Sequence, residues 1–264
     1  METHRNAFRD NTLLRAWRSG VHTVNGWLAL PDACCAEAMA HAGWDSLTID
    51  MQHGLVDYHD ALAMLQAIST TAVMPLVRVP WLDEGIIMKM LDAGAYGIIC
   101  PMINTPQQAL RFARACRYPP RGVRSIGPVR AALYAGPEYA SHADDMLLSL
   151  AMVETLDALA NLDAILDVDE LSGIYIGPSD LSLAHGLKPG MDREEPVMLQ
   201  AIGTVIEKTA AAGRFCGIHC ASVAYAYRML ARGANFATVG SDMRFVSAAA
   251  SAVVEEFRRG AVPT

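Results

Sequence analysis

Residues 171–183 combine a short apolar run with groups that could bind both an anion and a cation. A strand over 173–176 must end at Pro178, because proline has no N–H to give to a strand ladder. Beyond this break, the N–H groups of Ser179 and Asp180 open a helix and could bind an anionic oxygen. Asp180 adds a carboxylate beside that anion, and the two would repel each other unless a cation lay between them. Taken alone, Asp180 is better explained as a helix cap.

A second acid strengthens the cation hypothesis. Glu154 directly follows the apolar run 148–153, which is the predicted strand before 173–176. Neighbouring strands lie about 4.8 Å apart, so Glu154 and Asp180 should converge. Paired carboxylates without soft ligands favour a hard cation whose shell is completed by water and substrate. We therefore predict a divalent metal held by Glu154 and Asp180, with Mg²⁺ as first choice and Mn²⁺ or Co²⁺ as alternatives.

An arginine and a histidine follow two other predicted strands. Arg78 lies where it could neutralise an oxyanion that forms during a reaction. His53 follows Asp50 by three residues, and a nearby carboxylate would orient the imidazole and raise its basicity, as a general base needs. The plain alternatives are a packing or capping role for His53, and for Arg78 an ion pair with Asp50 or Asp242.

The elements that must position these residues alternate regularly. Eight strand–helix units without a break predict one closed (β/α)₈ TIM barrel of the α/β class, in which functional residues occupy the carboxyl ends of the strands. The predicted strands are 24–30, 46–51, 74–79, 97–101, 148–153, 173–176, 215–219 and 237–240. The predicted helices are 33–42, 58–68, 84–93, 106–116, 156–166, 196–212, 223–231 and 244–259.

We expect a single domain over residues 1–264, with an N-terminal arm or helix at 1–22 and a C-terminal helix at 244–260. Two insertions, 117–143 and 188–195, interrupt the alternation. Long ordered loops in compact domains are commonly functional, so both are candidates for a role in binding.

Composition excludes several classes of protein. The chain has 264 residues, 52% of them hydrophobic, and a formal net charge of −7 without a basic block, so we expect no nucleic-acid partner. No apolar run reaches the length of a membrane span, and the N-terminus lacks a signal core, so we expect a cytoplasmic protein without a membrane partner.

Lysine and cysteine placement narrows the chemistry. Lys89, Lys188 and Lys208 all fall on predicted helices or loops, so no amine is available inside the barrel for a Schiff base. Carbonyl chemistry would then need the metal as electron sink, without an organic cofactor. Cys216 and Cys220 flank His219, but in a strand His219 faces the opposite side, so we interpret the cysteines as buried free thiols.

Several segments together resemble the HpcH/HpaI aldolase/citrate lyase family of metal-dependent class II pyruvate aldolases. They are TIDMQH at 48–53, PLVR at 75–78, LDAG at 91–94, RYPPRGVR at 117–124, VET at 153–155 and IGPSDLS at 176–182. The likeness covers the chain from residue 24 onward. It departs at Gln52 and Met152, where better-known members often carry Glu and Gln.

The resemblance implies a phosphoenolpyruvate/pyruvate-type barrel in which pyruvate chelates a metal held by Glu154 and Asp180. The reaction would be reversible cleavage of a 4-hydroxy-2-oxoacid into pyruvate, or a related 2-oxoacid, and an aldehyde through a metal-stabilised enolate. The family is typically a hexamer in which the last helix packs on a neighbour, although packing on its own barrel is the alternative here.

The resemblance also implies roles for individual residues. Arg78 would stabilise the enolate, and His53 would act as base with support from Asp50 and Asp92. The turn 177–180 would bind the substrate carboxylate. The residues that we assign to substrate binding are Arg78, Gly177, Pro178, Ser179, Trp27 and Gln52; for Trp27, at the first strand, a core position is the alternative to a wall of the pocket.

Rival functions remain open at this point. An acyl-CoA lyase of the citryl- or malyl-CoA type shares the enolate chemistry, and the loop 117–130 could supply charge for the CoA phosphates. Oxaloacetate decarboxylation could occur at the same site. A catalytically silent barrel that binds a 2-oxoacid is the third reading.

Overall fold

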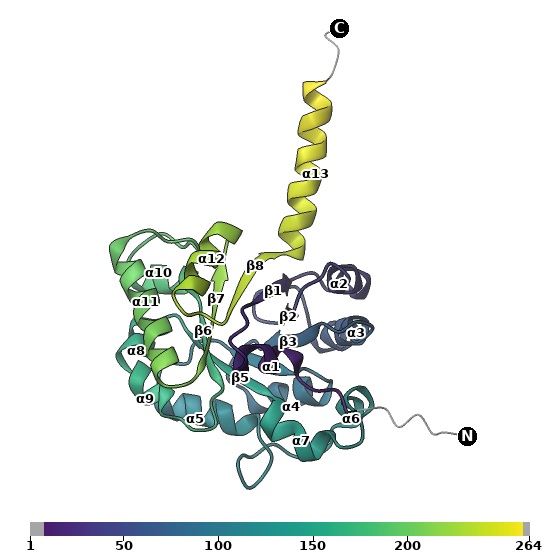
Figure 1. Cartoon of the computed structure of the whole chain (residues 1–264). Coiled ribbons are helices and arrows are strands. Elements are labelled where there is room, and N and C mark those ends of the chain that lie inside the picture. The colour runs from purple at the N-terminus through teal and green to yellow at the C-terminus, as the bar shows by residue number, and fades with distance from the viewer. Residues whose placement is uncertain (1–7, 261–264) are drawn as a thin grey trace, which may run out of the picture.

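The computed structural model describes residues 8–260, so residues 1–7 of the expected N-terminal arm and residues 261–264 lie outside the described part. Eight parallel strands close into a barrel in the order of the sequence, with helices around them, which confirms the predicted fold (Figure 1). The strands are β1 Thr23–Leu28, β2 Ser46–Asp50, β3 Met74–Arg78, β4 Gly97–Cys100, β5 Leu148–Val153, β6 Gly173–Ile176, β7 Phe215–Cys220 and β8 Phe236–Ser241.

Helix α1 precedes β1, and most of the other helices follow a strand and run back along the outside of the barrel. They are α1 Thr12–Arg18, α2 Ala33–Ala40, α3 Tyr58–Ile68, α4 Glu84–Asp92, α5 Pro106–Ala115, α6 Val129–Ala135, α7 Tyr139–Met146, α8 Leu156–Ala160, α9 Leu162–Leu166, α10 Pro178–Ala184, α11 Pro196–Ala211, α12 Val223–Ala231 and α13 Asp242–Arg259. The predicted helix 156–166 is thus two short helices that meet at Asn161. The insertion 117–143 is not a plain loop, because it contains α6 and the start of α7.

Local sequence explains why the helices begin where they do. Asp57 and Thr105 each cap a helix and form a capping box with the residue three positions on, which satisfies N–H groups that the helix itself leaves free. Pro178 begins α10, where its missing N–H costs nothing. Nearly every strand residue is buried, as expected of a parallel sheet covered on both faces. The eight carboxyl strand ends therefore meet at one rim.

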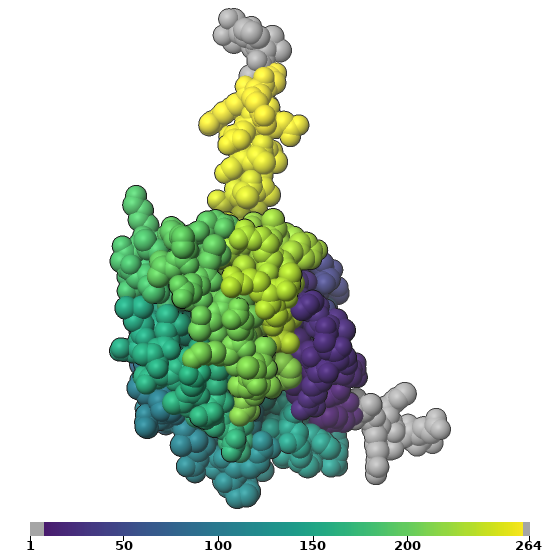
Figure 2. Space-filling view, turned by 60° about the vertical axis from the view of Figure 1, so that its left-hand side comes forward, coloured from purple at the N-terminus to yellow at the C-terminus, as the bar shows by residue number. Residues whose placement is uncertain are grey.

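The last helix differs from all others. Helix α13 extends away from the barrel (Figures 1 and 2). Of its residues only Asp242 is buried. The alternative that this helix packs on its own barrel is therefore wrong. No helix among residues 8–260 is long and apolar enough to cross a membrane.

Candidate active site at the carboxyl ends of the strands

Arg78 and Asp50 end neighbouring strands and form a buried ion pair. Register between β2 and β3 places them side by side. Nε of Arg78 donates to Oδ1 of Asp50 at 2.8 Å, and Nη2 donates to Oδ2 at 2.6 Å. The indole of Trp27 also donates to Oδ2, at 3.1 Å, and its ring lies 4.9 Å from the Arg78 guanidinium carbon. Of the two ion-pair partners expected for Arg78, Asp50 is the one observed. Asp242 instead accepts the backbone N–H groups of the two residues that follow β1.

This pairing stabilises the ionised form of Asp50. Burial by itself would raise the pKa of Asp50, but the hydrogen bonds and charge of Arg78, with the Trp27 hydrogen bond, hold that pKa below its usual value. The fork of two parallel bonds also fixes the plane of the guanidinium. Arg78 is thus a permanent, oriented cation at the rim, with donors left for a further anion.

His53 lies in the exposed turn that follows β2. Oδ1 of Asp50 accepts the backbone N–H groups of Gln52 and His53 at 3.0 and 3.3 Å. The expectation that Asp50 orients the imidazole is wrong: its oxygens bind Arg78, Trp27 and this backbone, and no hydrogen bond to the imidazole is found in the described chain. Asp50 positions His53 through the turn, and the ring is left free.

Asp92 is the one predicted catalytic residue that lies away from the site. It is the last residue of α4, which returns to the amino end of the barrel after β3. There its carboxylate accepts a 2.6 Å hydrogen bond from Arg124. Because His53 follows β2 at the opposite end, the prediction that Asp92 supports His53 within the chain is wrong.

Glu154 directly follows β5, and Asp180 lies in the first turn of α10, which follows β6. Glu154 is buried, and Oε1 accepts the Met102 N–H at 2.8 Å. Burial raises the pKa of Glu154 to about 7, and the charge of nearby Asp180 adds to the increase. A cation bound close to Glu154 would offset both effects and stabilise its ionised form.

Gly177 lets the chain pass close to Glu154. A Cβ at this position would lie 2.5 Å from Oε2 of Glu154, closer than any real contact. Within the turn 177–180, the Gly177 N–H is already bonded to the Val153 carbonyl at 3.2 Å and is not free for the substrate carboxylate. Pro178 has no N–H, so only Ser179 and Asp180 offer donors in this turn.

Met102 is a residue of the site that the sequence did not indicate. It holds Oε1 of Glu154 with a backbone φ of 56°, which L-residues rarely adopt. Such strain costs of the order of 1–3 kcal/mol and is commonly found at functional sites. An Asn or Gly at this position would have suggested a left-handed backbone, whereas a methionine does not.

The donor set agrees with a hard cation. Among residues 8–260 no group of three or more His, Cys, Asp and Glu side chains could hold a metal. Glu154 and Asp180 would therefore leave most of the coordination shell to water and substrate, as is typical of Mg²⁺ sites.

His219, in β7, also lies beside the candidate site, although the sequence suggested no role for it. The structure packs its imidazole edge-on against Trp27, with ring centroids 4.8 Å apart. Its position near the carboxyl end of a strand, on the face opposite two cysteines, is the sequence feature that could have indicated a role at the rim.

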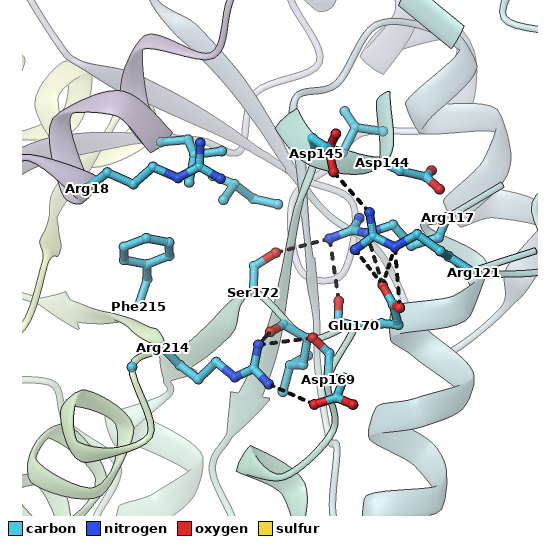
Figure 3. Close-up of a pocket in the computed structure, with 15 residues that line it drawn as sticks. Arg18, Arg117, Arg121, Asp144, Asp145, Asp169, Glu170, Ser172, Arg214 and Phe215 are labelled. Atoms are coloured by element: carbon cyan, nitrogen blue, oxygen red, sulfur yellow. Dashed lines mark hydrogen bonds and ion pairs between the residues drawn. The ribbon is translucent and has the colours of Figure 1, made fainter. Parts of the chain in front are cut away.

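Another group of charged side chains lies at the other end of the barrel. A cavity of about 200 Å³ opens there beside the first residues of β5 and β7 (Figure 3). Arg121 pairs with Glu170 at 2.9 Å and with Asp145 at 3.0 Å, and Arg117 donates to Ser172. The arginine-rich insertion therefore lies far from the rim that carries Glu154, and its charges are largely paired.

Comparison with known proteins gives three consistent findings. The HpcH/HpaI aldolase/citrate lyase family profile matches residues 24–249. A hydroxypyruvate/pyruvate aldolase of Rhizorhabdus wittichii is 44% identical over 94% of this chain and 99% of its own, and a 4-hydroxy-2-oxovalerate aldolase of Rhodococcus jostii is 37% identical over 94% and 96%. A crystal structure of an HpcH/HpaI aldolase/citrate lyase family protein from Burkholderia cenocepacia superposes with a TM-score of 0.87 at 29% identity, covering 94% of this chain and 99% of that one.

Proposed function

Because this chain belongs to the HpcH/HpaI aldolase/citrate lyase family, we propose that the rim around Arg78 and Glu154 is the active site of a pyruvate aldolase. The enzyme is a carbon–carbon lyase that reversibly cleaves a 4-hydroxy-2-oxoacid into pyruvate, or a related 2-oxoacid, and an aldehyde. The observation that supports this assignment is the pair of acids that follow adjacent strands, Glu154 after β5 and Asp180 at the start of α10, at the same rim as the oriented Arg78.

A divalent cation fits these acids. Oε1 of Glu154 is used by the Met102 N–H, while Oε2 faces Gly177, where the absence of a side chain leaves room. When bound, the cation would withdraw electron density from the 2-oxo group and make the adjacent carbon acidic. Oxygen ligands of this kind favour Mg²⁺, with Mn²⁺ or Co²⁺ as substitutes.

Arg78 and His53 divide the remaining work. Arg78 is held by Asp50 in one orientation, so its free donors stabilise negative charge on the substrate oxygen without reorganising. His53 is exposed and its ring is free to accept a proton, directly from the substrate hydroxyl or through a water molecule. The substrate carboxylate would bind the N–H groups of Ser179 and Asp180.

Trp27 and Gln52 complete the binding site. The Arg78 guanidinium lies over the face of the Trp27 ring, and this ring forms an apolar wall of the site. Oε1 of Gln52 is buried without a hydrogen-bond partner in the described chain, which is costly unless a ligand or water donates to it. Gln52 would thus accept a hydrogen bond from substrate.

The exposed helix α13 supports assembly into an oligomer. Its apolar side chains include Phe257 at 79% exposure, Val253 at 66% and Val246 at 57%. A row of this kind on a helix that stands clear of the barrel is best explained by burial against a second copy of the chain. The hexamer implied by the family resemblance is the state we propose.

An isotope exchange experiment tests the assignment. Chain stripped with EDTA should not exchange the methyl protons of pyruvate in D₂O, and added Mg²⁺ should restore exchange, as followed by proton NMR. Restoration separates the aldolase from a silent barrel that only binds 2-oxoacids. Equal exchange in EDTA and in Mg²⁺ would refute the role of the metal.

A further inference from the structure

A polar cluster inside the barrel, next to the proposed site, has no role in the chemistry described so far. His219 in β7 and Thr238 in β8 are register partners, and Tyr175 in β6 contacts both. Nδ1 of His219 lies 3.1 Å from the Tyr175 hydroxyl, which donates to Oγ1 of Thr238 at 2.7 Å. Asn25 also donates to Oγ1 of Thr238, at 2.8 Å. Apart from His219, these side chains are buried.

The direction of these hydrogen bonds determines the tautomer of His219. Burial raises the pKa of Tyr175, so its hydroxyl keeps its single proton and gives it to Thr238. The Tyr175 oxygen must then accept a hydrogen bond from His219, which places the imidazole proton on Nδ1. Burial also lowers the pKa of His219 to about 4, with the charge of Arg78 contributing. At neutral pH the ring is therefore uncharged, and Nε2 carries a bare lone pair.

That lone pair is available to a ligand. His219 is only partly buried, and Nε2 has no hydrogen-bond partner within residues 8–260. His219 and Arg78 contact the same indole, since Trp27 has the imidazole edge-on at 4.8 Å and the guanidinium carbon at 4.9 Å. His219 and Arg78 are thus neighbours around one indole, close enough for the charge of Arg78 to act on the imidazole.

We propose that Nε2 of His219 accepts a hydrogen bond from a hydroxyl group of the substrate, so that this enzyme selects hydroxylated substrates over their apolar isosteres. The selectivity rests on the proposed aldolase function and deepens it. A neutral acceptor discriminates hydroxyl from methyl because an apolar group leaves Nε2 unpaired and displaces its water. Tyr175 acts as a positioning residue, because its hydroxyl holds the proton of His219 on Nδ1.

Aldol addition with matched substrates tests the proposal. With pyruvate as nucleophile, glycolaldehyde and propanal compare hydroxyl with methyl in the aldehyde. With one aldehyde, hydroxypyruvate and 2-oxobutanoate make the same comparison in the 2-oxoacid. We expect the ratio of kcat/KM to favour the hydroxylated member of at least one pair by about tenfold in the natural chain, and to approach unity in His219→Leu. His219→Gln, which keeps an acceptor, should retain part of the preference.

Controls separate selectivity from the underlying chemistry. His22→Leu makes the same change at the other end of the barrel, where His22 lies beside the Ala234 carbonyl, and should leave both ratios unchanged. Pyruvate exchange in D₂O should persist in every variant, whereas its loss in the natural chain would contradict the aldolase assignment itself. Unchanged ratios in His219→Leu with exchange intact would overturn the role of His219 alone.

A measurement on the natural sequence does not depend on how the variants fold. In chain labelled with ¹⁵N-histidine, NMR should show His219 in the Nδ1–H tautomer, and Tyr175→Phe should mix the tautomers. Saturating glycolaldehyde or hydroxypyruvate should shift the Nε2 resonance, and propanal should not. An Nε2–H tautomer in the natural chain would refute the proposal.

Discussion

Charged side chains occur at both ends of the barrel, but the two ends differ in how completely these charges are paired. At the amino end, Arg121 pairs with Glu170 and Asp145, so positive and negative groups compensate each other. At the carboxyl end, Arg78 is matched by Asp50, while buried Glu154 has no ion-pair partner in the described chain and its pKa is raised by burial and by the charge of Asp180. The number of charges is therefore a poor guide to function. A site is marked by the acids that the protein leaves uncompensated.

The largest effect should come from removing one of these acids. Glu154→Gln keeps the shape of the side chain but removes its charge, so aldol cleavage should fall to background because the cation is lost. The matched change at the other end, Glu170→Gln, should leave kcat/KM near that of the natural chain and cost only about 1 kcal/mol of stability. Coupled assay of pyruvate release, with urea unfolding, measures both. Comparable loss of activity in the two variants would erase the proposed difference between the ends.

His53→Ala should give the next largest effect. Loss of a general base slows proton transfer by about 10²–10⁴-fold. Because His53 makes no hydrogen bond or ion pair with Glu154 or Asp180 in the described chain, we expect the affinity for Mn²⁺, measured by calorimetry, to stay unchanged. Weaker Mn²⁺ binding in this variant would make His53 a ligand rather than a base.

Arg78→Lys should lower kcat by about 10²–10³-fold, since an ammonium cannot reproduce the two parallel bonds to Asp50 while facing substrate. Arg78→Ala should be worse and should also unfold more easily, because it leaves Asp50 buried and unpaired. Steady-state kinetics and thermal unfolding of both variants give the comparison. Full activity in Arg78→Lys would show that orientation of the fork is unimportant.

Gly177→Ala should produce the smallest of these changes. The new Cβ would meet Oε2 of Glu154 at 2.5 Å, so the carboxylate must move and metal affinity should fall about 10–100-fold. Gly127→Ala is the control, because a Cβ there meets nothing within 4 Å. Calorimetric titration with Mn²⁺ compares the metal affinities of the two variants. Equal affinity in both variants would mean that the approach of residue 177 to Glu154 has no effect on the metal.

The repetition of strand and helix made the barrel predictable from the sequence. Predicted strands 148–153 and 173–176 match β5 and β6 at both ends, because Pro178 and the polar residues after Val153 end the apolar runs sharply. The rule that functional residues follow the strands of such a barrel then pointed to Asp50, Arg78, Glu154 and Asp180, and all four lie at or just after the carboxyl end of a strand.

The features that escaped prediction depend on three-dimensional detail. Asp92 resembles a site residue by motif, but its helix returns it to the amino end, where it meets Arg124. The left-handed backbone at Met102 is imposed by its surroundings and leaves no trace in a methionine. His219 was hidden because its partner, Tyr175, is 44 positions away in the chain.

A diffraction experiment with Mn²⁺ tests the central claim most directly. Crystals of the full chain soaked with Mn²⁺ and pyruvate should show one anomalous peak per chain within coordination distance of Glu154 and Asp180, absent in Glu154→Gln. A peak confined to the arginine- and acid-rich amino end, or Glu154 and Asp180 turned away from each other, would contradict the account.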